Sequence, residues 1–198
     1  MFIATASWVF LMRIVSEFGG TAVAGYTIGV RIMLFIMLPT FGLSNAVATL
    51  VGQNLGAKLP DRAEASVWKI MQYVSYYMLV TTVMVLLFAD EIISVFTQDP
   101  GVAEYAVSCL YIFSFGLIFF GISGAVAQAF NGAGDTMTST WINLFCFWIV
   151  QVPLAYLLAI TFSVGPVGVF WAVVVSDVLA GIVGVLVFRQ GRWKTRMV

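Results

Sequence analysis

Six long apolar segments, separated by short polar turns, constrain this chain more than any other feature of its sequence. A helix that crosses the hydrocarbon core of a bilayer needs about 20 mostly apolar residues, a length that all of these segments reach except the shorter first. We therefore predict an all-α membrane protein, a single bundle of six transmembrane helices over residues 1–198. The expected spans are about 1–16, 21–55, 62–89, 102–131, 137–162 and 167–188.

Composition supports this class and excludes several others. Hydrophobic residues make up 62% of the chain and charged residues 9%, with a mean hydropathy of +1.04, whereas about one quarter of the residues in soluble proteins are charged. Nine basic and nine acidic residues leave no net charge, so we expect no nucleic-acid partner. The chain has no histidine and only two cysteines, both within apolar runs. No metal site, catalytic nucleophile or cofactor motif appears, so we do not expect an enzyme.

The turn at residues 51–64 separates the second and third apolar runs and shows how two helices meet. Gly56 is suited to the left-handed conformation that ends a helix, and Pro60 cannot continue that helix. Asp61 followed by Glu64 predicts a reciprocal cap for the next helix. Within the second run, Pro39 predicts a bend, because proline removes a backbone hydrogen bond and clashes with the preceding turn.

The distribution of charge predicts the orientation. With six spans, the two groups of basic residues fall on one side of the membrane, and the loop from Asp90 to Glu104, which has four acidic residues and no basic one, falls on the other. Basic residues favour the cytoplasmic side, so both ends of the chain are expected there. The segment 92–96 is amphipathic and is expected to lie at the opposite interface. The basic residues are Lys58, Arg62 and Lys69 in the first group and Arg189, Arg192, Lys194 and Arg196 in the second.

Two charged residues, Arg31 and Asp177, lie deep in the predicted spans. A charge at the centre of a membrane helix costs about 2.5 to 3.5 kcal/mol on insertion scales, so such residues usually face a protein interior or a watery cavity. Counting residues places both at a similar depth, and we expect them to share one polar network. Aromatic residues such as Tyr26 could line a cavity for apolar cations, and the neutral polar residues of the spans are candidates either for the same pathway or for hydrogen bonds between helices. These polar residues are Asn45, Gln53, Gln128, Asn131, Asn143 and Gln151.

Three blocks of sequence resemble the multidrug and toxic compound extrusion (MATE) transporters. The first begins with Pro39-x-Phe41-Gly42-Leu43-Ser44-x-Ala46 and continues through 51–58 to Asp61-Arg62-Ala63. The other two are Phe130-Asn131-Gly132-Ala133-Gly134-Asp135-Thr136 and Arg189-Gln190-Gly191-Arg192-Trp193-Lys194. The resemblance implies the C-terminal six-helix lobe of a twelve-helix, two-lobe antiporter in the inner membrane, which exchanges H⁺ or Na⁺ for organic cations or drugs by alternating access. The coupling ion would be the only cofactor, and the partners would be the substrate, the lipid bilayer and an N-terminal lobe of the same polypeptide.

The resemblance also implies where an acid would be expected. Some members of the family carry cation-site acids at positions that correspond here to about Ala4 and Phe120, and neither residue is acidic. Coupling would then depend on the N-terminal lobe or on another acid such as Asp177. Two other functions remain open: a lipid-linked oligosaccharide flippase of the same superfamily, which would need a basic cavity, and a six-helix membrane subunit that assembles with itself.

Overall fold

The computed structural model describes residues 2–195 of the chain, with side chains from Ser7 to Lys194. Throughout this described part the chain is helical, apart from short turns, and contains no strand, so the predicted all-α fold is confirmed. The helices are α1 (Phe2–Ser16), α2 (Gly20–Gly56), α3 (Pro60–Ser94), α4 (Pro100–Gly132), α5 (Thr136–Leu144), η1 (Phe145–Gln151), α6 (Val152–Tyr156), η2 (Leu157–Thr161), α7 (Pro166–Arg189) and η3 (Arg192–Thr195). The four elements from α5 to η2 form one continuous helical span, Thr136–Thr161.

Five of the described helices are long and apolar enough to cross a membrane: α2, α3, α4, the span Thr136–Thr161 and α7. The described part of α1, Ser7–Ser16, is apolar but shorter. A helix rises about 1.5 Å per residue, so α2, with 37 residues, is longer than the core of a bilayer.

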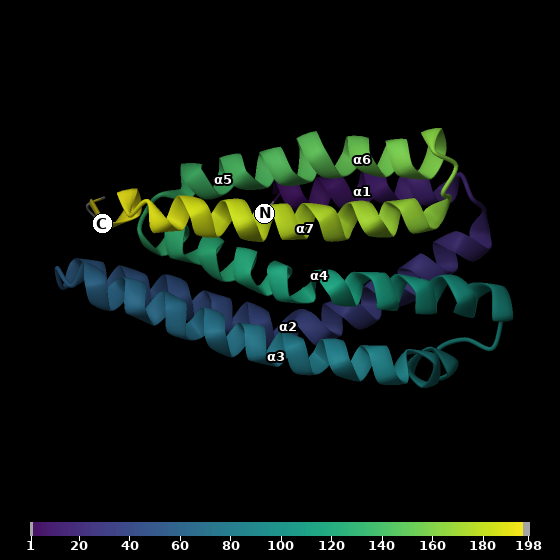
Figure 1. Ribbon diagram of the computed structural model, residues 1–198, viewed down its shortest axis with the longest axis horizontal. Helices are drawn as coiled ribbons and strands as arrows, with labels where there is room; N and C mark the ends of the chain where they lie inside the picture. Colours follow the sequence, from purple (N-terminus) through teal and green to yellow (C-terminus); the bar gives the residue numbers. More distant parts are fainter. Residues whose placement is uncertain (1, 196–198) are drawn as a thin grey trace.

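Helix α4 is the centre of the bundle. It packs against α2 and α3 on one side and against α7 on the other, and Figure 1 shows it between these two groups of helices. Glycines of α2 allow the close approach: a Cβ atom on Gly25 would lie 2.6 Å from the Cβ of Tyr105, and one on Gly29 would lie 2.7 Å from the sulfur of Cys109. This agrees with the expected use of small residues at contacts between membrane helices.

The turn between α2 and α3 differs in detail from the prediction. Gly56 stays in the helix, and it is Lys58 that adopts the left-handed conformation, with φ of 60°. Pro60 takes the first position of α3, for which its fixed φ is suited, so Asp61 lies beyond the cap position. No side-chain cap forms, and the predicted capping box is wrong. The carboxylate of Glu64 instead accepts hydrogen bonds from Trp68 and from Lys194 of the C-terminal turn.

Helix α3 continues beyond the expected end of the third span. Its backbone leaves helical geometry at Phe88, with φ of −125° and ψ of 17°, and then resumes a helix that ends at Ser94. The segment 92–96, expected as a separate interfacial piece, is therefore the last turn of this kinked helix and the loop after it. Pro39, by contrast, lies inside an unbroken α2. The hydroxyl of Tyr77 on α3 donates a hydrogen bond of 2.8 Å to the carbonyl of Ile36, close to the position where proline removes a backbone donor.

The turns lie at two opposite ends of the bundle. The α2–α3 turn, the α4–α5 turn and the C-terminal turn occupy one end, and the α1–α2, α3–α4 and η2–α7 connections occupy the other (Figure 1). Trp193 joins the elements at the first end: its side chain is buried, stacks on Phe188 at 4.8 Å between ring centroids and donates a hydrogen bond to the Phe188 carbonyl. The described residues of the two basic groups therefore lie at the same end; Arg196 lies outside the described residues.

Candidate functional site: a cavity between the helices

A cavity of about 570 Å³ lies inside the bundle. Its volume falls in the range of about 300 to 1,000 Å³ that is typical of small-molecule sites. The lining comes from α1, α2, α4, α5, η1 and α7, and it includes Trp8, Met33, Thr40, Ser44, Asn45, Phe113, Phe120, Gln128, Asn131, Asn143, Phe147, Gln151 and Asp177.

On α2 and α4 the lining residues follow the spacing of one helical face. On α4 they recur at every third or fourth position from Phe113 to Asn131, as expected for one side of a helix with 3.6 residues per turn. The opposite faces of α4 pack against α3 and α7. The cavity is therefore bounded by one face of each of these helices and extends along the bundle.

Three of the predicted polar residues meet at one end of the cavity. Gln128 donates a hydrogen bond of 2.9 Å from Nε2 to Oδ1 of Asn45, and Asn131 donates one of 3.2 Å from Nδ2 to Oε1 of Gln128. This chain of amides joins α2 to α4. Asn45 and Asn131 are exposed, so the chain lies at the rim of the cavity.

The buried part of the lining carries polar groups without partners. Asp177, on α7, is 8% exposed and forms no ion pair or hydrogen bond with the described residues. Its Oδ2 lies against α4, since a Cβ atom on Gly116 would be 3.6 Å from it. The side-chain oxygens of Thr40 and Ser44 on α2 and of Gln151 on η1 are also buried without a hydrogen-bond partner. Buried polar groups usually find partners, so the cavity is suited to a ligand that supplies them.

Asp177 is the only ionisable side chain that lines the cavity within the described part of the chain. No lysine or arginine balances it there. A lone carboxylate in an otherwise neutral lining creates a negative potential that attracts cations.

The span from Thr136 to Thr161 is not a regular α-helix. Phe145–Gln151 and Leu157–Thr161 are π-helical, a form with wider turns that often occurs at functional sites. Asn143, Phe147 and Gln151 of this span all line the cavity, and Gln151 is the last residue of the first π-helical segment. Apart from Pro153 nearby, the sequence gives no signal for this feature.

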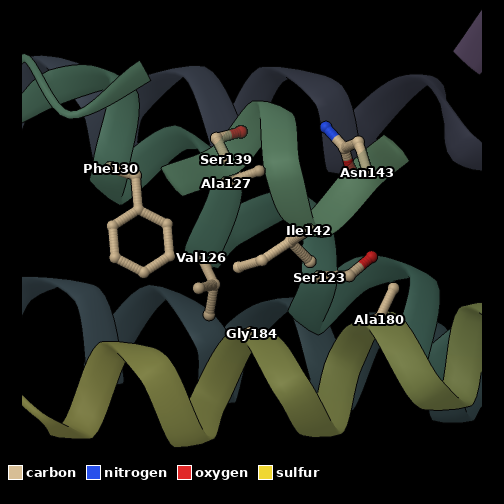
Figure 2. A pocket seen from close by; sticks show the side chains of 9 residues that line it. All are labelled: Ser123, Val126, Ala127, Phe130, Ser139, Ile142, Asn143, Ala180 and Gly184. Atoms are coloured by element: carbon tan, nitrogen blue, oxygen red, sulfur yellow. The ribbon is translucent and has the colours of Figure 1, made fainter. Parts of the chain in front are cut away.

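A second, smaller pocket of about 10 Å³ lies next to the cavity, between α4, α5 and α7. It shares Ser123, Ser139 and Asn143 with the cavity lining, and Figure 2 shows these side chains with Val126 and Ile142 around it. This volume is enough for about one water molecule, so the pocket is an extension of the site.

Three of the predicted site residues lie elsewhere. Arg31 is exposed on α2 and does not line the cavity, and it forms no ion pair with Asp177. A direct pair between these two residues is therefore wrong, because a similar depth along two helices does not fix the direction in which each side chain points. Gln53 is also exposed outside the cavity.

Tyr26 lies behind the cavity wall instead of lining it. Its ring is buried, stacks on Phe170 at 5.8 Å and contacts the rings of Trp8 and Phe113, which do line the cavity. Phe120, one of the two positions considered for a family acid, lines the cavity. The side chain of the other, Ala4, lies outside the described residues.

A bundle of membrane-length helices around a ligand-sized cavity is an architecture that membrane transporters use. The sequence profile of the MatE family matches residues 1–157, and the chain belongs to this family, the MATE transporters, which are not enzymes. The helical fold and the three sequence blocks therefore indicate the same class, a membrane transporter.

Relatives and solved structures agree with this assignment. The chain is 24% identical to the probable multidrug resistance protein NorM of Thermotoga maritima, with 91% of this chain and 39% of that protein covered. It is 30% identical to the probable NorM of Mannheimia succiniciproducens, with 85% and 37% covered. The MATE transporter ClbM, solved in complex with Rb⁺, matches with a TM-score of 0.92 and 26% identity over 100% of this chain and 47% of ClbM. The chain thus spans less than half the length of these relatives.

Proposed function

We propose that this chain is the C-terminal lobe of a cation-coupled antiporter that exports organic cations or drugs. The observation that carries the proposal is Asp177, a buried carboxylate without a partner in the described structure, on the wall of a cavity that has no basic lining residue. The names of the relatives as multidrug resistance proteins support the substrate class.

The antiport mechanism that we propose follows from one carboxylate serving two cations. An ionised Asp177 attracts an organic cation into the cavity, and the apolar side chains of Met33, Phe113 and Phe147 cover the rest of the ligand. When H⁺ or Na⁺ neutralises the carboxylate, the organic cation loses this attraction and leaves. Because the carboxylate can bind only one of the two cations at a time, the inward movement of the coupling ion drives the outward movement of the organic cation.

We assign the part of the relatives' length that this chain does not match to a second lobe. Alternating access in transporters built from repeats needs two halves that move against each other around a central site. The proposal therefore includes an N-terminal lobe in the same polypeptide and an inner-membrane location with both ends of this chain in the cytoplasm, in line with the basic residues gathered at one end.

The flippase alternative is less well supported. A cavity that holds the phosphates of a lipid-linked oligosaccharide needs basic side chains, and the only charged residue of the described lining is acidic. Arg31, the basic residue that the sequence places deepest in a span, is exposed and does not line the cavity.

The test measures efflux of a cationic dye, driven by a gradient of H⁺ or Na⁺, in proteoliposomes that contain the protein as its complete gene encodes it. We expect Asp177→Asn to reduce efflux at least tenfold. Glu104→Gln, a change of an exposed acid outside the cavity, is the matched control and should leave efflux unchanged. Full activity of Asp177→Asn would refute the proposed role of this carboxylate.

A further inference from the structure

Gln151 and Asp177 lie at the same level on neighbouring antiparallel helices. At the start of this pair, Gly168 lies against Leu158 and Ala159, where an added Cβ would be 2.8 to 2.9 Å from their atoms. Counting from this contact, Gln151 is level with about residue 175 or 176, less than one turn from Asp177. Both side chains line the cavity, so they face the same part of it.

The amide of Gln151 has no hydrogen-bond partner among the described residues, although its side chain is only 1% exposed. Burial of an unpaired amide costs free energy. The residue ends the first π-helical segment and lines the cavity. An unpaired amide oxygen therefore belongs to the cavity lining at about the level of the carboxylate.

Aromatic rings can bind a cation whether or not it carries N–H donors, through their faces. The cavity has such rings, among them Phe113, which packs against Tyr26 and Phe170 at 6.5 Å and 5.9 Å between centroids. The oxygen acceptors of Gln151 and Asp177 are therefore the groups of the lining that can distinguish a cation with N–H donors from one without.

We propose that the cavity selects cations that carry N–H donors, namely protonated amines, over quaternary ammonium ions of the same charge, through hydrogen bonds to the Gln151 amide oxygen and the Asp177 carboxylate. The inference rests on the proposed function of the cavity and specifies its substrate class. A ligand that enters displaces the water around these groups, and a ligand that cannot replace those hydrogen bonds loses affinity. Sites built to hydrogen-bond a ligand discriminate strongly against an analogue without the donor.

The experiment compares two fluorescent probes of equal charge in nanodiscs that contain the protein as its complete gene encodes it. One is monodansyl-ethylenediamine, whose terminal ammonium has N–H donors, and the other is its N,N,N-trimethyl analogue, which has none at that nitrogen. Dansyl emission reports binding, with empty nanodiscs subtracted. We expect the ammonium probe to bind about tenfold more tightly, a difference of about 1.4 kcal/mol.

Variants assign the preference to the proposed residue. Gln151→Leu, or Gln151→Met if the first variant does not fold, should weaken the binding of the ammonium probe only. The preference for this probe over the trimethyl probe should then fall to threefold or less. Gln72→Leu, the same change at an exposed residue of α3, should keep it. Asp177→Asn should weaken the binding of both probes, because both carry one positive charge.

The outcomes separate the two proposals. If the unmodified protein binds both probes within twofold, or if a folded Gln151 variant keeps the full preference, the selection for N–H donors is refuted while the role of Asp177 in efflux stands. If neither probe binds and efflux does not depend on Asp177, the proposed function is refuted, and the selection with it.

Discussion

The ammonium of Lys194 lies 3.2 Å from the carboxylate of Asp61, although 133 residues separate them in the sequence. Lys194 also pairs with Glu64, whose other oxygen accepts a hydrogen bond from Trp68. The C-terminal turn is thus tied to the beginning of α3. This contact brings the third block of family-like sequence against the first.

The Lys194 contact predicts a modest contribution to stability that depends on pH. The hydrogen bond to Glu64, with a further one to Asp61, raises the pKa of Lys194 above its usual value. A raised pKa of a lysine means that the stabilisation is fully present below the unfolded pKa of about 10.4 and is lost as pH rises through the higher folded pKa. At pH 7.5 we expect Lys194→Met to lower the free energy of unfolding by about 1 kcal/mol or less, because the pair is partly exposed.

Thermal unfolding in detergent measures this effect. Lys69→Met, which removes an exposed lysine without a partner in the described structure, is the control. Equal melting temperatures for the two variants would contradict the contribution of Lys194.

Trp193 predicts a larger effect in the same turn. Its side chain is 1% exposed, stacks on Phe188 and donates a hydrogen bond of 3.0 Å to the Phe188 carbonyl. Trp193→Ala should destabilise the protein by about 3 to 5 kcal/mol, as expected for a large buried aromatic residue. Trp193→Phe keeps a stacked ring and loses the hydrogen bond, so a loss of about 1 kcal/mol is expected. Unfolding followed by intrinsic fluorescence would show the order, and an alanine variant as stable as the phenylalanine variant would contradict it.

The contact of α4 with α2 at Gly132 predicts that even one methyl group is harmful. A Cβ atom there would lie 2.4 Å from the carbonyl oxygen of Ala48 and 2.8 Å from its Cα. Gly132→Ala should therefore destabilise by about 1 to 3 kcal/mol through overpacking. Gly42→Ala is the control, because an added Cβ at Gly42 meets no atom within 4 Å and alanine favours a helix. Detergent melting curves in which both variants behave alike would rule out the close contact.

The arrangement of the ends predicts opposite labelling at two positions. Lys58 lies in the α2–α3 turn and Asp99 in the α3–α4 connection, at opposite ends of the bundle (Figure 1). Lys58→Cys should react with an impermeant maleimide from the cytoplasmic side and Asp99→Cys from the other side. Native Cys109 and Cys146 are buried and provide the background. Labelling of both engineered cysteines from one side would contradict the topology.

The sequence predicted which polar residues belong to the site better than it predicted how they are arranged. Asn45, Gln128 and Asn131 do join one network, and Asp177 and Gln151 do line the cavity. The cost of placing polar groups in an apolar span singled these residues out, but the same reasoning also selected Arg31 and Gln53, which are exposed and lie outside the cavity.

What the sequence could not provide was the rotation of each helix about its axis. A membrane helix that is apolar on all sides carries little periodic signal, so Arg31 and Asp177 could be matched in depth but not in direction. The π-helical segment that ends at Gln151, where η1 packs against α7, was not predicted either. The capping box at Asp61 and Glu64 failed for a local reason, since Pro60 fits the first helical position.

The hydrogen bond from Tyr77 to the Ile36 carbonyl couples the middle of α2 to α3. Pro39 weakens α2 as an independent rod, because the carbonyl of Phe35 has no backbone donor four residues ahead. With the neighbouring carbonyl held by Tyr77, any change in the bend of α2 must either carry α3 along or break this bond. The hydrogen bond therefore links the proline region of α2 to α3, so a change in the bend of α2 is transmitted to a helix that does not itself line the cavity.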